Sequence, residues 1–105
     1  MTRPETIRSF LATAGWADAS ASRLAGDASA RRYERLRHPT LGNAVLMDAP
    51  PDTGEDIRPF RRIAEHLCRL GLSAPQIFAA DAETGLLLLE DLGDGVFARL
   101  IEQDP

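Results

Sequence analysis

Residues 26 to 32 read GDASARR and combine small residues with two adjacent arginines, Arg31 and Arg32. Glycine and other small residues let backbone amides approach phosphate oxygens, and an arginine guanidinium can bind a phosphate through two hydrogen bonds. The same pattern is also typical of an ordinary hairpin loop. Taken alone, these residues favour the hairpin. Phosphate binding therefore depends on what the neighbouring segments form.

Metal and thiol chemistry has less support in the sequence. His66 and Cys68 lie two residues apart in a helical pattern, so their side chains diverge by about 160° and cannot easily share a metal. We expect structural roles for both, with Cys68 as a buried apolar thiol. The acidic residues Asp48, Asp52, Glu55 and Asp56 are interpreted as a solvated loop with a helix cap, and a metal site there is the weaker alternative.

Composition narrows the class of protein. The 105 residues, 44% of them apolar, suffice for one small core but not for two. The net charge of −4 disfavours a basic nucleic-acid binder. All twelve basic residues are arginines, so no lysine of this chain can take part in any mechanism. No apolar run approaches the ~20 residues that cross a bilayer, and we expect a soluble, cytoplasmic protein without a membrane partner.

The elements that must position these residues follow from periodicity and from turn residues. Thr2 and Glu5 form a capping box that starts a helix over 4–14, and Gly15 ends it. Trp16 is expected to pack this helix onto a sheet. The remaining pattern predicts strands over 22–25, 32–36, 44–48, 75–80 and 85–90, a long helix from Ile57 to Leu70 capped by Asp56, and a final helix over 96–101.

Two details of this pattern bear on packing. Four consecutive leucines, residues 86 to 89, predict a strand covered on both faces. His38 and Pro39 predict a turn between two strands. The predicted fold is therefore α+β, with a five-stranded antiparallel sheet, a long helix between strands 3 and 4, and an additional N-terminal helix.

Four motifs in this order resemble the N-terminal lobe of the protein-kinase-like fold, in its aminoglycoside and choline phosphotransferase branch. They are closest to the bacterial kinases that phosphorylate the anomeric hydroxyl of N-acetylmuramate and N-acetylglucosamine in cell-wall sugar recycling. The motifs are GDASARRYERL (26–36), AVLMDAPP (44–51), PFRRIAEHLCRLGLSAPQIFAAD (59–81) and GLLLLEDLGD (85–94). The resemblance covers the whole chain, 1–105, as one nucleotide-binding lobe.

The resemblance implies an ATP-dependent phosphotransferase whose adenine contacts the backbone of Glu90 and Leu92, with Val45 over one face of the ring. It also makes phosphate binding the preferred interpretation of the 26–32 loop, because Gly26 and Ser29 fall where the family has a glycine and a hydroxyl residue. Mg²⁺ is implied as well, with its ligands and the catalytic aspartate in a C-terminal lobe whose first helix begins at residues 95–105. No catalytic or metal-binding residue is expected within residues 1–105.

One position departs from the family. Aligning AVLM with the strand that carries the kinase lysine puts Met47 where a cation should contact the phosphates. The partner glutamate is also missing, because Glu65 points roughly 150° away from the apolar stripe of its helix. We therefore hypothesise that Arg32, or else Arg31, supplies the cation.

Three interpretations remain open on the sequence. The first is the ATP-binding lobe of an amino-sugar kinase, with a nucleotide and a sugar as partners; this chain alone is then expected to be inactive. The second is a noncatalytic module that binds a partner chain through the apolar faces of the long helix and of residues 96–101. The third is an arginine-rich nucleic-acid contact, which the acidic balance disfavours.

Overall fold

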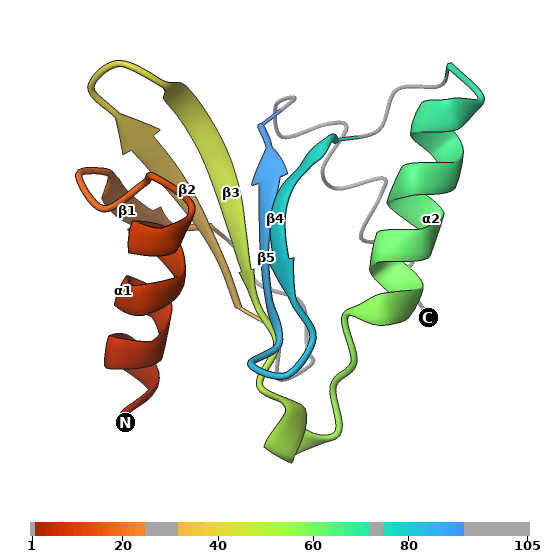
Figure 1. Ribbon diagram of the computed structural model, residues 1–105, viewed down its shortest axis with the longest axis horizontal. Coiled ribbons are helices and arrows are strands. Elements are labelled where there is room, and N and C mark those ends of the chain that lie inside the picture. The colour runs from red at the N-terminus through yellow and green to blue at the C-terminus, as the bar shows by residue number, and fades with distance from the viewer. Residues whose placement is uncertain (1, 25–31, 72–74, 92–105) are drawn as a thin grey trace.

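The computed structural model describes residues 2–24, 32–71 and 75–91. A five-stranded sheet in the order β1-β2-β3-β5-β4 forms its centre, and every pair of neighbouring strands is antiparallel. One helix lies on each side of the sheet (Figure 1). In chain order the elements are α1 (Arg3–Thr13), β1 (Ser20–Arg23), β2 (Arg32–His38), β3 (Gly42–Asp48), a 3-10 turn η1 (Pro51–Thr53), α2 (Arg58–Arg69), β4 (Ile77–Asp81) and β5 (Leu86–Glu90).

This arrangement confirms the predicted α+β class and the five antiparallel strands, although several boundaries differ. The strands β2 and β3 extend as far as the pair His38 and Gly42, beyond the apolar pattern, because their backbones keep pairing up to the turn. β1 begins two residues earlier than expected, at Ser20, where it pairs with Arg37. The predicted helix over 96–101 lies outside the described residues.

Helix α1 lies one residue earlier than predicted at each end, but the predicted cap and stop are present. The Thr2 hydroxyl accepts a hydrogen bond from the Glu5 amide at 3.4 Å, which satisfies one free donor of the first turn. Gly15 adopts φ +85°, a left-handed conformation that favours glycine. Trp16 is 6% exposed and packs with Phe10 and Leu11 of α1 against the sheet, as expected.

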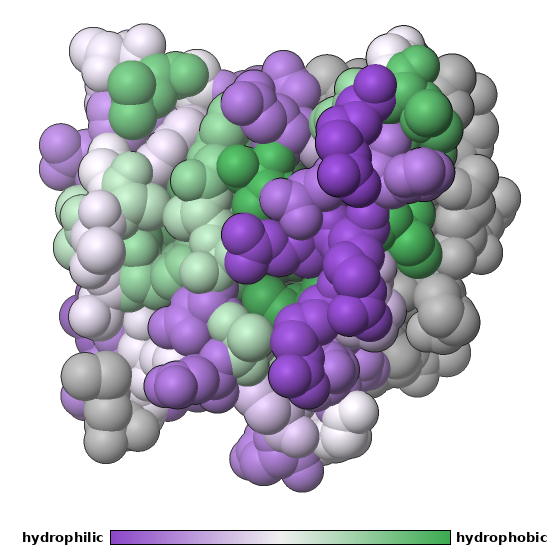
Figure 2. Space-filling model, turned by 45° about the vertical axis from the view of Figure 1, so that its right-hand side comes forward, coloured by the Kyte–Doolittle hydropathy of each residue, from purple (hydrophilic) through white to green (hydrophobic). Residues whose placement is uncertain are grey.

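Helix α2 starts slightly differently from the prediction. Its N-cap is Ile57, one residue after the expected Asp56. The Asp56 carboxylate nevertheless accepts a hydrogen bond from the Arg58 amide at 3.0 Å, so it still satisfies a donor of the first turn. Hydrogen bonds from the Arg58 side chain lower the pKa of Asp56. The outer face of α2 is hydrophilic (Figure 2) and bears several exposed polar or charged side chains, Arg58, Arg61, Arg62, Glu65, His66 and Arg69.

The core consists of two apolar clusters separated by the sheet. Leu87 and Leu89 of β5 pack on the α2 side with Phe60, whereas Leu86 and Leu88 pack on the α1 side. All four leucines are completely buried, which confirms that β5 is covered on both faces. This strand therefore contributes side chains to both clusters.

Asp48 does not belong to a solvated loop, as the sequence had suggested. It is the last residue of β3 and is only 9% exposed. Arg3 of α1 donates hydrogen bonds to its carboxylate through Nε at 2.9 Å and through Nη2, and Nη1 of the same arginine donates to the Thr84 carbonyl at 2.6 Å. The expectation was wrong because a charged residue in an acidic run reveals nothing of a partner 45 positions away.

No helix in the described part of the chain is long and apolar enough to cross a membrane.

Candidate nucleotide-binding face

Val45 and Met47 lie on the α2 side of the sheet, because both belong to the cluster that contains Phe60. Both side chains are essentially inaccessible, with exposed fractions of 1% and 0%. Met47 pairs with Tyr33 on β2 and with Leu87 on β5. The position predicted for a phosphate-binding lysine therefore carries an apolar side chain that packs in the core.

The predicted orientation of Glu65 is confirmed. Its side chain is 51% exposed and forms an ion pair with Arg61 one turn earlier, with the Nε and Oε1 atoms 3.6 Å apart. Phe60 and Ala64, by contrast, are buried against the sheet. Because Glu65 lies on a different face of α2, it is not positioned to support a cation near Met47.

Arg32 lies on the opposite side of the sheet from Val45 and Met47. Side chains alternate along a strand, and Tyr33 belongs to the α2 cluster, so Arg32 faces the α1 side. Its partner in register is Asp48, whose carboxylate binds Arg3 of α1. The described geometry thus does not support the preference for Arg32 as the phosphate cation. Arg31, Gly26, Ser29 and Leu92 lie outside the described residues.

Residues at the end of β5 form several hydrogen bonds that the sequence did not predict. The Glu90 amide donates to the Gln76 carbonyl at 2.8 Å, and the Glu90 carboxylate accepts from the Gln76 amide at 3.2 Å. Asp91, the next residue, accepts two hydrogen bonds from Arg35 of β2. Neither Arg35 nor Asp91 was identified from the sequence. The alternation of β2 could have placed Arg35 on the face of Tyr33, but no sequence pattern indicates its partner.

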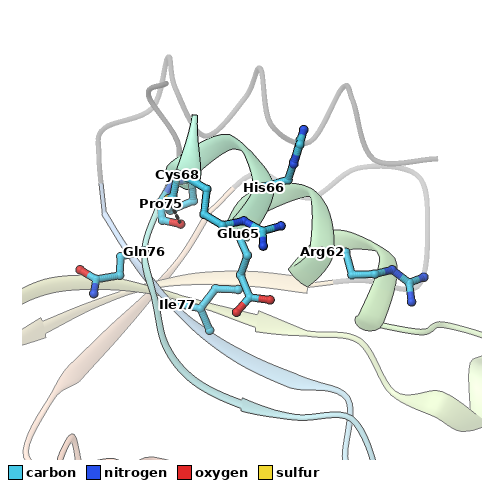
Figure 3. Close-up of a pocket in the computed structure, with 8 residues that line it drawn as sticks. Arg62, Glu65, His66, Cys68, Pro75, Gln76 and Ile77 are labelled. Carbon is cyan, nitrogen blue, oxygen red and sulfur yellow. Dashed lines mark hydrogen bonds between the residues drawn. The ribbon is translucent and has the colours of Figure 1, made fainter. Parts of the chain in front are cut away.

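A groove of about 660 Å³ lies between the C-terminal half of α2 and β4 (Figure 3). His66 and Arg62 point away from one another in this view, while Glu65 points toward Ile77. The polar groups of this groove do not converge on one point, and the described residues contain no group of three side chains able to hold a metal.

The prediction that Cys68 is buried was wrong. The residue is exposed, and its thiol donates to the Pro75 carbonyl at 3.6 Å. Cys68 lies on the flank of α2 in its last turn, next to the segment that leads into the edge strand β4. Periodicity placed Cys68 near the apolar stripe, but the exposure of a residue at the edge of that stripe depends on tertiary packing.

Comparison with known proteins shows which sequences this chain is similar to. No family model matches the sequence. The chain is similar to a curated N-acetylmuramate/N-acetylglucosamine kinase from Caulobacter vibrioides, with 40% identity over 89% of this chain and 32% of that protein. Kinases of the same name from Pseudomonas aeruginosa and Pseudomonas putida are 44% and 36% identical, over 75% and 95% of this chain.

The chain is therefore a homologue of part of a sugar kinase. More particularly, the three relatives named here are N-acetylmuramate/N-acetylglucosamine kinases, which confirms the resemblance found in the four motifs. It spans between about a quarter and a third of the length of the curated relatives it matches, namely 32%, 24% and 30%.

Proposed function

We propose that this chain is the ATP-binding lobe of a kinase that phosphorylates the anomeric hydroxyl of N-acetylmuramate or N-acetylglucosamine. The observation that carries this proposal is the shared name of relatives that match most of this chain at 36–44% identity. A role in cell-wall sugar recycling follows from the same substrates. The reaction requires the remainder of the longer protein, so we expect the 105 residues alone to be inactive.

The fold supports the nucleotide-binding part of this proposal. The sheet order β1-β2-β3-β5-β4, with α2 connecting β3 to β4, is the arrangement expected for a protein-kinase-like N-terminal lobe. In such a lobe the nucleotide lies against the sheet face that the helix shares. Val45 belongs to the buried apolar cluster on that face, which is the face proposed to receive the purine ring.

The proposed adenine site is the segment that follows β5. The backbones of Glu90 and Leu92 would hold the ring edge, because a strand that ends leaves backbone groups without a neighbouring strand. The phosphates would extend toward Gly26 and Ser29. The cation is proposed to come from the Arg31 and Arg32 pair, and the turn of Arg32 toward α1 makes Arg31 the stronger choice.

Mg²⁺ would neutralise the phosphates and orient them for transfer when bound. Its ligands are proposed to come from the C-terminal lobe, as the resemblance to the kinase family implies. The catalytic aspartate is proposed to come from the same lobe. This chain then contributes binding and orientation of the nucleotide.

Part of the surface that the interaction-module alternative requires is not accessible. It required the apolar face of the long helix, but Phe60 and Ala64 of α2 are buried against the sheet. No described contact favours a partner chain in place of a nucleotide. A nucleic-acid role likewise gains no support from the net charge of −4.

The test uses the full-length protein with ATP and Mg²⁺, and each of three acceptors: N-acetylmuramate, N-acetylglucosamine and an aminoglycoside. We expect transfer to the two amino sugars only, and a product whose phosphorus NMR signal couples to the anomeric proton. The matched control is the methyl glycoside of each sugar, whose anomeric oxygen is blocked and should not react. Transfer to the aminoglycoside alone, or to a methyl glycoside, would contradict the proposed acceptor.

A further inference from the structure

An ion pair joins β2 to the segment that follows β5. Arg35 Nε donates to Asp91 Oδ2 at 2.7 Å, and Arg35 Nη2 donates to Asp91 Oδ1 at 3.4 Å. The two residues are 56 positions apart, and their side chains are only 20% and 5% exposed. A carboxylate so deeply buried requires a partner. The guanidinium of Arg35 is one such partner and helps to hold Asp91 in place.

The pair lies on the face of the sheet proposed to receive the nucleotide. Arg35 follows Tyr33 by two positions, so both side chains are on the α2 side. In register, Arg35 is opposite Val45, and Val45 is opposite Leu89. The arginine thus reaches across β3, past the residue proposed to cover adenine, to the first residue after β5.

Each end of this bridge belongs to a different wall of the proposed adenine site. β2 carries Arg35, and the loop before β2 is the one proposed to cover the phosphates. Asp91 lies between Glu90 and Leu92, whose backbones are proposed to hold the ring edge. The Glu90 amide donates to Gln76 of the segment before β4, on one flank of β5. Arg35 reaches Asp91 from the other flank, across β3.

We propose that Arg35 is a nucleotide-positioning residue, which acts through its two-point contact with Asp91 to set the backbone that binds adenine. This inference rests on the proposed function. A planar guanidinium fixes both the distance and the orientation of a carboxylate, whereas an ammonium group fixes only the distance. Loss of Arg35 should therefore weaken ATP binding and leave acceptor binding unchanged.

The experiment compares steady-state constants of the full-length protein, with thermal unfolding measured in parallel. Arg35→Met should raise the KM for ATP by about tenfold and change the KM for the sugar by less than about twofold. Arg35→Lys should recover only part of the loss, because it keeps the charge but not the two-point geometry. Arg37→Met is the matched control: it removes the same group from the same strand and side, two positions away, where Arg37 is exposed.

A double variant separates positioning from a loss of folding. Arg35→Met alone leaves the Asp91 charge buried, whereas Arg35→Met with Asp91→Asn removes both charges and should recover most of the thermal stability. If the pair positions the nucleotide, the KM for ATP stays high in the double variant. If the KM for ATP returns to the wild-type value together with stability, the pair is only structural and the inference is overturned.

The proposed function and this inference fail in different ways. If the wild-type protein neither binds ATP nor phosphorylates a sugar, the proposed function is wrong. If the wild type is active but Arg35→Met and Arg37→Met have the same KM for ATP, only the role of Arg35 is wrong.

Discussion

At the scale of single residues, Met47 occupies the position where the resemblance to kinases predicts a lysine. Its side chain is fully buried in an apolar cluster, and Glu65, the only acidic residue of α2, is exposed on another face. A cation introduced at position 47 would have no acidic partner within that cluster. We therefore expect the proposed phosphate cation at another position.

Met47→Lys should destabilise the protein without strengthening ATP binding. A buried ammonium without a partner is expected to cost about 3 kcal/mol in the free energy of unfolding. Met47→Leu is the control and should cost less than about 1.5 kcal/mol, because its volume is conserved. Urea unfolding measures both. A Met47→Lys protein of wild-type stability that binds ATP more tightly would contradict the apolar role of this position.

The arginine pair gives a second prediction at this scale. We expect Arg31→Ala to raise the KM for ATP by about tenfold, since one charge-assisted hydrogen bond to phosphate is lost. Arg32→Ala should change it by less than about twofold, because Arg32 shares the α1 face of the sheet with Asp48. Unchanged ATP affinity in both variants would remove the pair from the site, and an effect of Arg32→Ala alone would reverse the assignment.

At the scale of elements, the approach to β5 depends on one glycine. Gly85 has φ +71°, and a Cβ atom there would lie 1.9 Å from the Ala49 carbonyl oxygen. The Ala49 amide also donates to the Gly85 carbonyl at 2.8 Å, which ties the end of β3 to the start of β5. The backbone at this position must therefore pass too close for any side chain.

Gly85→Ala should lower the free energy of unfolding by about 3 kcal/mol, since strain and a backbone clash add. Gly42→Ala is the matched control. Gly42 has φ +90° but no atom within 4 Å of the added Cβ, so it should cost only the conformational strain, about 1 kcal/mol. Equal losses in the two variants would show that the Ala49 contact does not matter.

At the scale of the whole molecule, β5 connects the two apolar clusters. Leu87 packs toward α2 and Leu88 toward α1, and both are completely buried. The apolar clusters on both faces of the sheet therefore contain side chains of the same strand. We expect the two layers to unfold together.

Leu87→Ala and Leu88→Ala should each lower the free energy of unfolding by about 3 kcal/mol, through lost burial and the cavity left behind. Leu41→Ala, at a position 57% exposed, is the control and should cost less than about 0.5 kcal/mol. Fluorescence of Trp16, which reports the α1 side, should follow the same transition as circular dichroism. Separate transitions in the Leu87→Ala protein would show that the layers are independent.

The sequence by itself determined the local structure and the relationship to known proteins. The Thr2 cap, the left-handed stop at Gly15 and the doubly covered leucine strand depend on neighbouring residues, and all three are confirmed. The four motifs likewise identified the sugar-kinase relatives. These features are readable because helix periodicity, capping and strand burial repeat over a few residues.

Only the tertiary structure decided which charged residues meet and which face each one occupies. It brought Arg35 to Asp91 and Arg3 to Asp48, turned Arg32 toward α1, and left Cys68 exposed. Ion pairs between residues 45 or 56 positions apart depend on strand order and register. Those are set by packing of the whole sheet between its two helices, and no local pattern encodes them.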